Sequence, residues 1–432
     1  MRALGIDFGT SNTVAVVRGG DGRTRPLLFD GAPLLPSAVY REPDGRLLVG
    51  HDAHRRARID PAGFEPHPKR RVDDGTVLLR DTETPVPQLI AAVLRHVAAE
   101  ARRQLGGLDE VRLTHPASWG QRRRAVLVQA AYAAGLPQPT LVAEPVAAAA
   151  YYTAVLGAAL PPGRALAVYD LGGGTFDAAV VRREPTGFDA AGFVVLAEQG
   201  LTEVGGLEFD QALVEHLGRA YSPNRTVMWN GLVAPADTGS RRARALLYDD
   251  VRAAKETLSR TASADVHLPA LDVAAHLTRD ELESLIHGHL ARTVDCLAQT
   301  VTAAGLTPAD LVGVFLVGGS SRIPLAARLI HTRLGVAPTT LEQPETVVAD
   351  GVLRMAGAAR TAPPGPPAPA PRSPAVPSPV PYLSSPAGPY PVPAAAATPA
   401  RPWYDEHGPV LVAILAALVL LAAVVLVALL LS

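Results

Sequence analysis

The hydrophobic and polar positions of residues 1–358 follow two periods. Short apolar runs that end in glycine-rich turns indicate strands, and longer runs with apolar residues three and four positions apart indicate helices. Helical spacing extends over residues 86–105 and 122–134, and each run stops at a glycine. Residues 278–281 have the sequence Thr-Arg-Asp-Glu, a capping box that predicts a helix running to about residue 304. This part of the chain is therefore predicted to be a folded mixture of strands and helices.

One strand–turn–strand pattern occurs twice. Residues 3–10 contain the turn sequence Asp-Phe-Gly-Thr, and residues 166–175 contain Asp-Leu-Gly-Gly-Gly-Thr. A second apolar run follows each turn. Because the two copies begin about 160 residues apart, we expect two related lobes, residues 1–163 and 164–358, that face one another across a cleft.

The pattern changes after the second lobe. Residues 361–402 are rich in proline, alanine and serine, a composition that cannot form a packed core, and we predict a disordered linker over residues 359–408. Val410–Leu431 is an uninterrupted apolar run without a charged residue. At ~1.5 Å per residue, a helix of that length spans about 33 Å, which matches the core of a bilayer. A buried core helix is the alternative, but the linker separates this run from any core. We therefore predict a transmembrane helix over residues 409–431.

The start of the chain predicts on which side of the membrane the folded part lies. Asp7 interrupts the first apolar run too early for a secretory signal peptide. Only Ser432 follows the predicted transmembrane helix, which is the pattern of a single-pass tail anchor. We therefore expect an anchor in the cell membrane that holds the folded part on the cytoplasmic side.

Composition narrows the possible chemistry. The 40 basic and 41 acidic residues give a net charge of −1, so no nucleic-acid partner is expected. The single cysteine, Cys296, excludes an internal disulfide and a cysteine zinc cluster. Lys69 and Lys255 are the two lysines of an otherwise arginine-based set. An ammonium is a compact point charge, whereas a guanidinium is a wide planar fork, so arginine cannot replace lysine everywhere. The two lysines are therefore candidates for function. The bias toward arginine alone is equally consistent with two lysines retained by chance.

The two glycine-rich turns are candidate phosphate-binding sites. Backbone N–H groups can point into such turns, and no side chain blocks the approach of a phosphate. Gly9–Asn12 and Gly172–Thr175 fit this description, and their hydroxyl groups add donors. Asp7 and Asp170 end the strands before the turns, where a pair of carboxylates could hold a hydrated magnesium ion. The two matched turns together predict one shared nucleotide site.

A third glycine turn lies in residues 314–324. A predicted buried strand leads into Gly318 and Gly319, and a helix begins with an early proline, Pro324. The glycines would let a flat base approach the backbone, and Arg322 could stack on that base. An ordinary strand-to-helix turn with a solvated arginine is the alternative. The sequence contains neither a Walker phosphate loop nor a Rossmann glycine motif after a strand, so those phosphate sites are excluded.

These elements together resemble the ATPase domain of the 70-kDa heat-shock chaperones, within the actin and sugar-kinase superfamily. The resemblance is carried by G-I-D-F-G-T-S-N at Gly5–Asn12, A-E-P-V-A-A-A at Ala143–Ala149, Y-D-L-G-G-G-T-F-D at Tyr169–Asp177, G-G-L-E-F-D at Gly205–Asp210 and V-G-G-S-S-R-I-P at Val317–Pro324. It covers residues 1 to about 358. It implies an α/β fold of the actin-like (ribonuclease H-like) two-lobed ATPase type that binds ATP or ADP with Mg²⁺.

The resemblance also implies a role for each residue that matches a family motif. The implied catalytic residues are Lys69, Glu144, Thr175 and Asp177, and the implied ligands of magnesium, through water, are Asp7 and Asp170. The implied nucleotide-binding residues are Gly9, Thr10, Ser11, Asn12, Gly172, Gly173, Gly174, Thr175, Gly205, Gly206, Lys255, Ser259, Gly318, Gly319, Ser320 and Arg322. Both lysines of the chain are therefore expected in the active site.

Two functions remain open. The resemblance implies that family members continue into a leucine-rich linker, a peptide-binding β-sandwich and a helical lid, whereas a proline-rich stretch follows here. The sequence therefore leaves open whether peptide binding persists without that domain. The first function is a membrane-tethered, chaperone-like ATPase, and the second is a nucleotide-sensing membrane scaffold with little or no turnover. An actin-like filament or a small-molecule kinase is less favoured, because no sugar pocket with a catalytic base is recognisable. The sequence does not identify a protein partner or co-chaperone.

Overall fold

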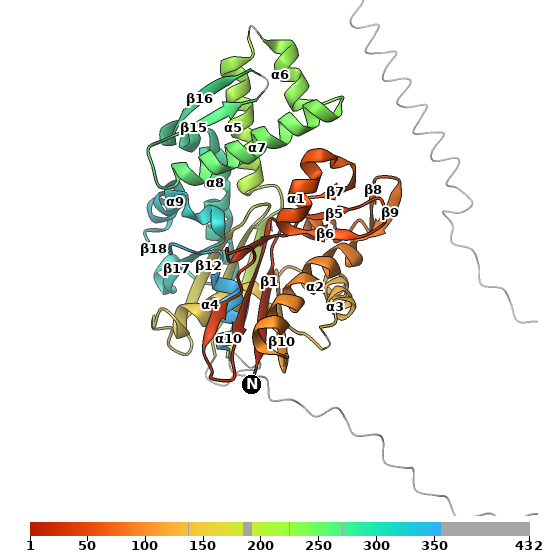
Figure 1. Ribbon diagram of the computed structural model, residues 1–432. Coiled ribbons are helices and arrows are strands. Elements are labelled where there is room, and N and C mark those ends of the chain that lie inside the picture. The colour runs from red at the N-terminus through yellow and green to blue at the C-terminus, as the bar shows by residue number, and fades with distance from the viewer. Residues whose placement is uncertain (137, 185–191, 224, 270, 356–432) are drawn as a thin grey trace, which may run out of the picture. The chain divides into compact units, whose positions relative to one another are not determined.

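Two large β-sheets form the framework of the protein (Figure 1). The computed structural model describes residues 1–355 apart from 137, 185–191, 224 and 270. The first sheet has the strand order β11 (Thr140–Ala143), β10 (Glu110–His115), β1 (Ala3–Phe8), β2 (Asn12–Arg18) and β3 (Thr24–Pro26), with β4 (Leu34–Pro36) also paired to β2. The second has the order β14 (Phe193–Leu201), β13 (Phe176–Arg183), β12 (Ala165–Leu171), β17 (Leu311–Val317) and β18 (Pro338–Thr339). We call residues 1–163 the first half and residues 164–355 the second half.

Each half contains one copy of the repeated hairpin. β1 pairs with β2 and β12 with β13, both antiparallel, which confirms the predicted hairpins. The centre of each sheet also has parallel pairs, β1 with β10 and β12 with β17. Nearly every residue of β1 and β12 is buried, as expected for central strands covered on both faces.

The predicted helices form where the pattern placed them. α2 (Val86–Leu105) ends at Gly106, whose φ of 73° provides the left-handed cap that glycine adopts without strain. α3 (Gln121–Ala133) follows and packs on α2. α8 (Arg279–Ala303) begins at the predicted capping box, in which the Thr278 side chain and the Glu281 side chain each bind the other residue's backbone. α8 contacts β13 and β14, and α9 (Pro324–Leu334) packs on α8.

Two helices join the halves. α4 (Glu144–Ala154) follows the first sheet but contacts β12, β13, β14 and β17 of the second. α10 (Val347–Arg354) follows the second sheet but contacts β1, β2, β10 and α4. Figure 1 shows α10, in blue, beside α4 and the strands of the first sheet. One buried cluster therefore takes apolar side chains from both sheets, including Val14 and Phe315. This shared core joins the two halves at their base.

The crossing of α10 and α4 depends on Gly351. A Cβ atom at Gly351 would lie 2.0 Å from the carbonyl oxygen of Ala147 in α4. We expect Gly351→Ala to lower the free energy of unfolding by about 3 kcal/mol, because backbone cannot move aside as a flexible side chain can. Gly288→Ala in α8 is the control, since a Cβ there meets nothing within 4 Å and helix propensity favours alanine by ~0.5–1 kcal/mol. Urea unfolding measures both, and equal effects would contradict the packing argument.

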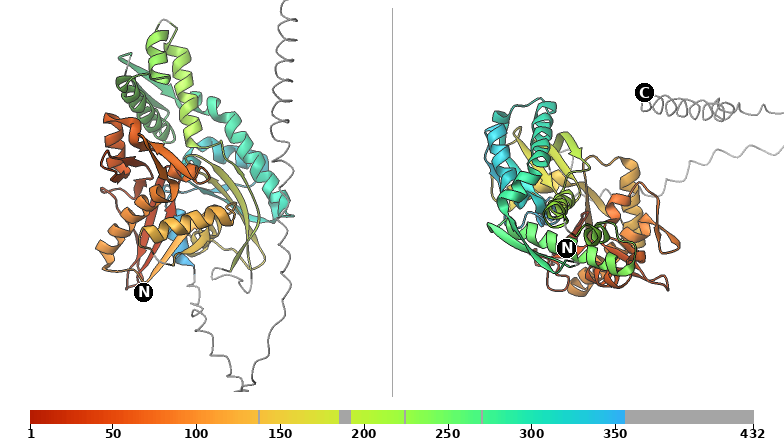
Figure 2. Two further views of the ribbon diagram at one scale, coloured as in Figure 1. Left: turned by 90° about the vertical axis from the view of Figure 1, so that its right-hand side faces the viewer. Right: turned by 90° about the horizontal axis from the view of Figure 1, so that it is seen from above.

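Each half carries a smaller upper part. In the first half it consists of α1 (Gly50–Ile59), β5 (Val39–Arg41), β6 (Leu47–Val49), β7 (Phe64–Glu65), β8 (Thr76–Leu79) and β9 (Thr82–Pro85). In the second half it consists of α5 (Gly206–Tyr221), α6 (Thr226–Val233), α7 (Thr238–Leu258), β15 (Ser263–Leu268) and β16 (Val273–Thr278). Figure 2 shows from further sides that these green elements lie together at one end of the second half. The upper parts meet where α1 contacts α7.

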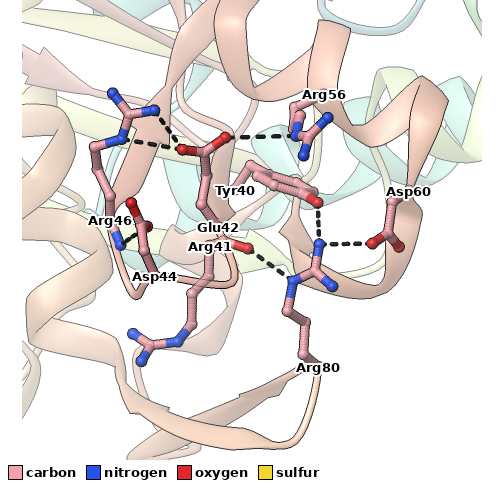
Figure 3. Close-up of polar contacts among 8 residues, drawn as sticks. All are labelled: Tyr40, Arg41, Glu42, Asp44, Arg46, Arg56, Asp60 and Arg80. Atoms are coloured by element: carbon pink, nitrogen blue, oxygen red, sulfur yellow. Dashed lines mark hydrogen bonds and ion pairs between the residues drawn. The ribbon is translucent and has the colours of Figure 1, made fainter.

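A buried tyrosine organises the upper part of the first half (Figure 3). The Tyr40 ring is fully buried, and the guanidinium carbons of Arg56 and Arg80 lie 6.0 and 5.6 Å from its centroid. Arg80 also donates to the Tyr40 hydroxyl, to Asp60 at 2.6 Å and to the carbonyl oxygen of Arg41 at 3.1 Å. Arg80 lies between β8 and β9, so these bonds tie that hairpin to β5 and α1. The segment that carries Lys69 lies between β7 and β8 in the chain, within the same upper part.

None of the helices in residues 1–355 combines the length and apolar character needed to cross a bilayer. The predicted linker, residues 359–408, and the predicted transmembrane helix, residues 409–431, lie outside the described residues.

Candidate active site

A cleft of about 220 Å³ opens between the two halves. Asp7 from the end of β1 and Asp170 from the end of β12 both line it, together with both predicted phosphate turns and the third glycine turn. The sequence-predicted residues in its lining are Asp7, Gly9, Thr10, Ser11, Asn12, Asp170, Gly172, Gly173, Gly206, Lys255, Ser259, Gly318, Gly319, Ser320 and Arg322. These fifteen residues come from five segments that are far apart in the sequence, and they share one cleft.

The first turn is held by side chains of the first half. The Ser37 hydroxyl donates to the carbonyl oxygen of Gly9 at 2.8 Å, and the Ser37 N–H donates to that of Ser11 at 2.9 Å. His67 Nδ1 lies 3.2 Å from the carbonyl oxygen of Thr10 and must donate, since a carbonyl oxygen only accepts. Burial lowers the pKa of His67 to about 4, so the imidazole is neutral and keeps this bond at physiological pH. With its carbonyls engaged, the turn can present N–H and hydroxyl groups to the cleft.

The second turn is held by the start of α5. The Gly206 N–H donates to the carbonyl oxygen of Gly172 at 3.1 Å, and the Leu207 N–H donates to that of Gly173 at 2.8 Å. Gly205 does not line the cleft. A Cβ at Gly205 would lie 2.9 Å from the backbone of Gly173, so this glycine lets α5 approach the turn. Gly205 therefore supports the second turn from behind and does not contact the cleft.

The two turns touch each other. A Cβ at Gly173 would lie 2.2 Å from Ser11 Oγ, and a Cβ at Gly174 would lie 2.7 Å from Thr10 Cγ2. The second and third glycines of the Gly-Gly-Gly sequence are thus required because the first turn occupies the space of a side chain. This contact closes one side of the cleft between the halves.

Lys255 and the third glycine turn line another part of the cleft. The buried Lys255 ammonium donates to the carbonyl oxygen of Gly206 and pairs with Asp210, both at 2.6 Å, which ties α7 to α5. Gly318 has a φ of 81°, and a Cβ there would lie 2.5 Å from Asp170 Oδ1. Arg322 lies 3.8 Å from Glu345, and the two side chains are 32% and 19% exposed. The Arg322 guanidinium is thus held loosely enough to rearrange over a base.

Besides Gly205, five predicted site residues lie outside the cleft lining: Lys69, Glu144, Gly174, Thr175 and Asp177. Lys69 Nζ donates to Glu144 Oε1 at 3.0 Å, and these side chains are only 12% and 10% exposed. The Thr175 hydroxyl donates to Asp177 Oδ2 at 3.3 Å. Glu144 and Asp177 line a second, smaller cavity, which they share with Asp170. Gly174, in contact with Thr10, is likewise outside the cleft lining.

Negative charge dominates this centre. Burial is the main cause that raises the pKa of Asp7, of Asp177 and, strongly, of Asp170, and it raises the pKa of Glu144 to about 7. Burial alone would lower the pKa of Lys69, but attraction to Glu144 and the neighbouring aspartates outweighs it and raises that pKa. One ammonium thus faces four carboxylates, an arrangement that favours binding of an additional cation.

The donor set fits a magnesium ion. Mg²⁺ prefers hard oxygen ligands and keeps several waters, so one or two carboxylates with substrate phosphates suffice. Asp7 and Asp170 supply such oxygens in the cleft, and Thr114 orients Asp7 by donating to its Oδ1 at 2.9 Å. Within the described residues, no three acidic, histidine or cysteine side chains converge closely enough to bind a metal directly. A metal at Asp7 and Asp170 would therefore be held largely by water and phosphate.

The raised pKa of Glu144 predicts a pH dependence of stability in the absence of metal. Its pKa is near 4.5 in the unfolded chain and about 7 in the folded protein, so the folded state binds this proton more tightly. The free energy of unfolding should therefore fall as pH rises from about 4.5 to about 7 and then level off. Glu144→Gln should reduce this fall by up to about 3 kcal/mol, whereas Glu203→Gln should not. Urea unfolding with a chelator, near pH 5 and pH 7.5, measures the difference; an unchanged fall in Glu144→Gln would contradict it.

The sequence did not identify several residues of the cleft. Asp210 and Arg252, 3.5 Å apart, line it, as does Glu345. Asp210 could have been recognised as a buried acid on the apolar face of α5, and Arg252 as a neighbour of Lys255 on α7. Glu345 precedes α10 in a loop without a local signal, so only the tertiary structure places it.

Comparison with known proteins agrees with this geometry. The family model described as Hsp70 protein matches residues 71–361. The chaperone protein HscA of Pectobacterium carotovorum is 33% identical over 382 residues, which covers 82% of this chain and 58% of HscA. The chaperone protein DnaK of Thermus thermophilus is 31% identical over 394 residues, which covers 82% of this chain and 60% of DnaK. The chain thus spans less than two thirds of the length of these curated relatives.

The family match covers residues 71–163 of the first half and all of the second half, and it includes Glu144, Asp170, Thr175, Asp177 and Lys255. The mixed α/β fold is consistent with the actin-like ATPase domain of that family, and the predicted family is confirmed. The chain belongs to the Hsp70 family.

Proposed function

We propose that the chain binds ATP with magnesium in the cleft and hydrolyses it to ADP and phosphate. The observation that carries the proposal is the convergence of two glycine turns from opposite halves on one cleft, with Asp7 and Asp170 in its lining. ATP is bound, in this account, with its phosphates at the two turns and its base near Gly318, Gly319 and Arg322. Magnesium held at the carboxylates would neutralise charge on the phosphates.

The residues beside the cleft supply the groups that phosphoryl transfer to water needs. That reaction depends mainly on positioning and on electrostatic stabilisation. The Lys69 ammonium, held by Glu144, is the positive charge nearest the carboxylates and stabilises charge on the terminal phosphoryl group. Glu144 and Asp177 orient the attacking water, and the Thr175 hydroxyl fixes Asp177. Movement of the halves would couple the bound nucleotide to the shape of the protein, as in a chaperone-like cycle.

Ion pairs between the upper parts are expected to slow the release of ADP. Arg58 of α1 pairs with Asp249 of α7 at 2.9 Å. The backbone carbonyl oxygen of Arg58 also accepts a hydrogen bond from Arg242 of α7 at 2.8 Å. Because the Arg58 and Asp249 side chains are 49% and 36% exposed, the pair contributes at most ~1 kcal/mol, and Arg58→Ala should speed release by up to about fivefold. Arg55→Ala is the matched control, since Arg55 pairs with Asp52 inside α1. Stopped-flow release of a fluorescent ADP measures both; equal rates would contradict a role for this contact.

Turnover tests the proposed activity. The full chain in detergent should release phosphate from ATP when magnesium is present and not when it is chelated. Absence of turnover with saturating MgATP would refute hydrolysis.

We also propose that Val410–Leu431 spans the cell membrane and tethers the ATPase part on the cytoplasmic side. The support is the uncharged apolar run itself and its separation from the folded part by a proline-rich stretch. After cell fractionation, the full chain should remain with membranes in alkaline carbonate, and a chain lacking residues 405–432 should not. Retention of the shortened chain in the membrane fraction would refute the tether.

A further inference from the structure

A second cavity reaches the residues proposed to orient water. It is lined by Pro116, Ala117, Ser118, Glu144, Pro145, Val168, Asp170, Asp177, Ala178, Ala179, Glu198 and Gln199. Asp170 is the one lining residue that it has in common with the cleft, so the two spaces meet at the proposed catalytic centre and otherwise have separate walls. Ser118 and Glu198 are exposed, so the cavity extends from buried carboxylates to the surface.

The strands of the second sheet leave room for this cavity. Glu198 of β14 lies opposite Ala179 of β13, and the small Ala179 side chain is on the same face of the strand as Asp177. A Cβ at Gly200, opposite Asp177, would lie 2.9 Å from Asp177 Oδ1. The carboxylate therefore occupies space that a larger residue at position 200 would fill. One alanine and one glycine keep the approach to Asp177 open.

The size and polarity of the cavity determine which small molecule it can hold. It offers about 20 Å³, and one water molecule needs ~10–15 Å³ on the same kind of measure. A phosphate ion does not fit, because each of its oxygens is already about the size of a water. A buried water also needs two to four polar partners, and the carboxylates of Glu144, Asp170 and Asp177 with the Ser118 hydroxyl supply them. The space therefore suits water.

The reaction consumes water at a cleft that the nucleotide itself would occupy. In each turnover the oxygen of one water bonds to the terminal phosphorus, the bond from that phosphorus to the bridging oxygen breaks, and one proton is released to solvent. A triphosphate bound at the two turns would occupy the cleft, and Gly173 and Gly174 lie against the first turn beside it. Lys69, Glu144 and Asp177 are not among the residues that line the cleft.

We propose that this second cavity is the entry path and holding site for the water that attacks ATP, with Ser118 and Glu198 at its mouth. The inference rests on the proposed ATPase function and adds to it the route of the second reactant. Glu198 is a positioning residue here: its carboxylate keeps the mouth hydrated and does not touch the nucleotide.

Blocking the mouth tests the proposal with the full chain in detergent. Ser118→Phe should lower the single-turnover rate of ATP hydrolysis about tenfold and leave ATP affinity within about twofold. Ser284→Phe, the same change at an exposed serine of α8 that lines neither space, is the control and should hydrolyse ATP like the unsubstituted chain. Glu198→Gln should lower the rate about threefold, whereas Glu203→Gln, the same change at a nearby residue that lines neither space, should not.

The outcomes separate this proposal from the proposed function. Unchanged hydrolysis in both Ser118→Phe and Glu198→Gln would overturn the water path, while turnover by the unsubstituted chain would still support the ATPase. An equal loss of affinity and rate in Ser118→Phe, with Glu198→Gln unchanged, would also overturn it, because the loss would then come from distortion of the cleft. Absence of turnover in the unsubstituted chain would refute the proposed function itself.

Discussion

Replacement of Lys69 by alanine is expected to reduce ATP hydrolysis by about 10²–10³-fold. Among the described residues, the Lys69 ammonium is the one positive side chain bonded to the carboxylate cluster, through Glu144 at 3.0 Å. Without it, magnesium alone would balance the charge that develops on the terminal phosphoryl group. ATP affinity should change by less than about threefold, because Lys69 is not part of the cleft lining and the turns would still bind the phosphates. Single-turnover hydrolysis and equilibrium binding, measured on the same preparation, separate the two quantities.

The loss in Lys69→Ala should not be a loss of folding. Removing one partner of a buried ion pair costs ~3–5 kcal/mol when the other stays charged. Glu144 can instead bind a proton, since its pKa is already about 7 with the ammonium present. Arg71→Ala is the control in the same segment, because Arg71 pairs with Glu65 and Asp74 and its side chain is 49% exposed. Equal rates of ATP hydrolysis in Lys69→Ala and the unsubstituted chain would show that Lys69 has no role in the reaction.

Replacement of Gly173 by valine is expected to weaken ATP binding by at least about 100-fold. The Cβ atom would lie 2.2 Å from Ser11 Oγ and 3.0 Å from Ser11 Cβ, so the two turns must separate. Separation of the turns would move the donors of Gly9–Asn12 away from those of Gly172–Thr175. A triphosphate could then bind one turn but not both. Calorimetric titration with MgATP measures the loss.

The neighbouring glycine provides the control for this steric argument. A Cβ at Gly172 would meet only the carbonyl oxygen of Thr175, at 3.6 Å, which is ordinary contact. Gly172→Ala should therefore weaken ATP binding much less than Gly173→Val, by less than about tenfold. Similar losses in the two variants would mean that the contact between the turns does not set the affinity.

Local patterns predicted the elements of the fold well. The run of apolar residues before Gly106 predicted the bounds of α2, and Thr278 with Glu281 predicted the start of α8. Both helix boundaries depend on capping residues and helical spacing within a few positions of one another. The two hairpins, β1 with β2 and β12 with β13, were likewise predicted from short apolar runs on either side of a glycine turn.

Contacts between distant segments were not predictable in the same way. The packing of α10 against the first sheet depends on Gly351 meeting Ala147 across about 200 residues of sequence, and no local pattern encodes that distance. The pairing of Lys255 with Asp210 and the position of Glu345 have the same origin. The sequence suggested a nucleotide site through its repeated turn, but the separation of that site into a cleft and a second cavity emerges only from the assembled sheets.

Calorimetric titration of the full chain with ATP measures whether one nucleotide binds between the two turns. We expect one ATP per chain, with affinity that is strongly reduced when magnesium is chelated. Absence of binding at millimolar MgATP, or a stoichiometry and affinity that are unchanged in Gly173→Val, would contradict it.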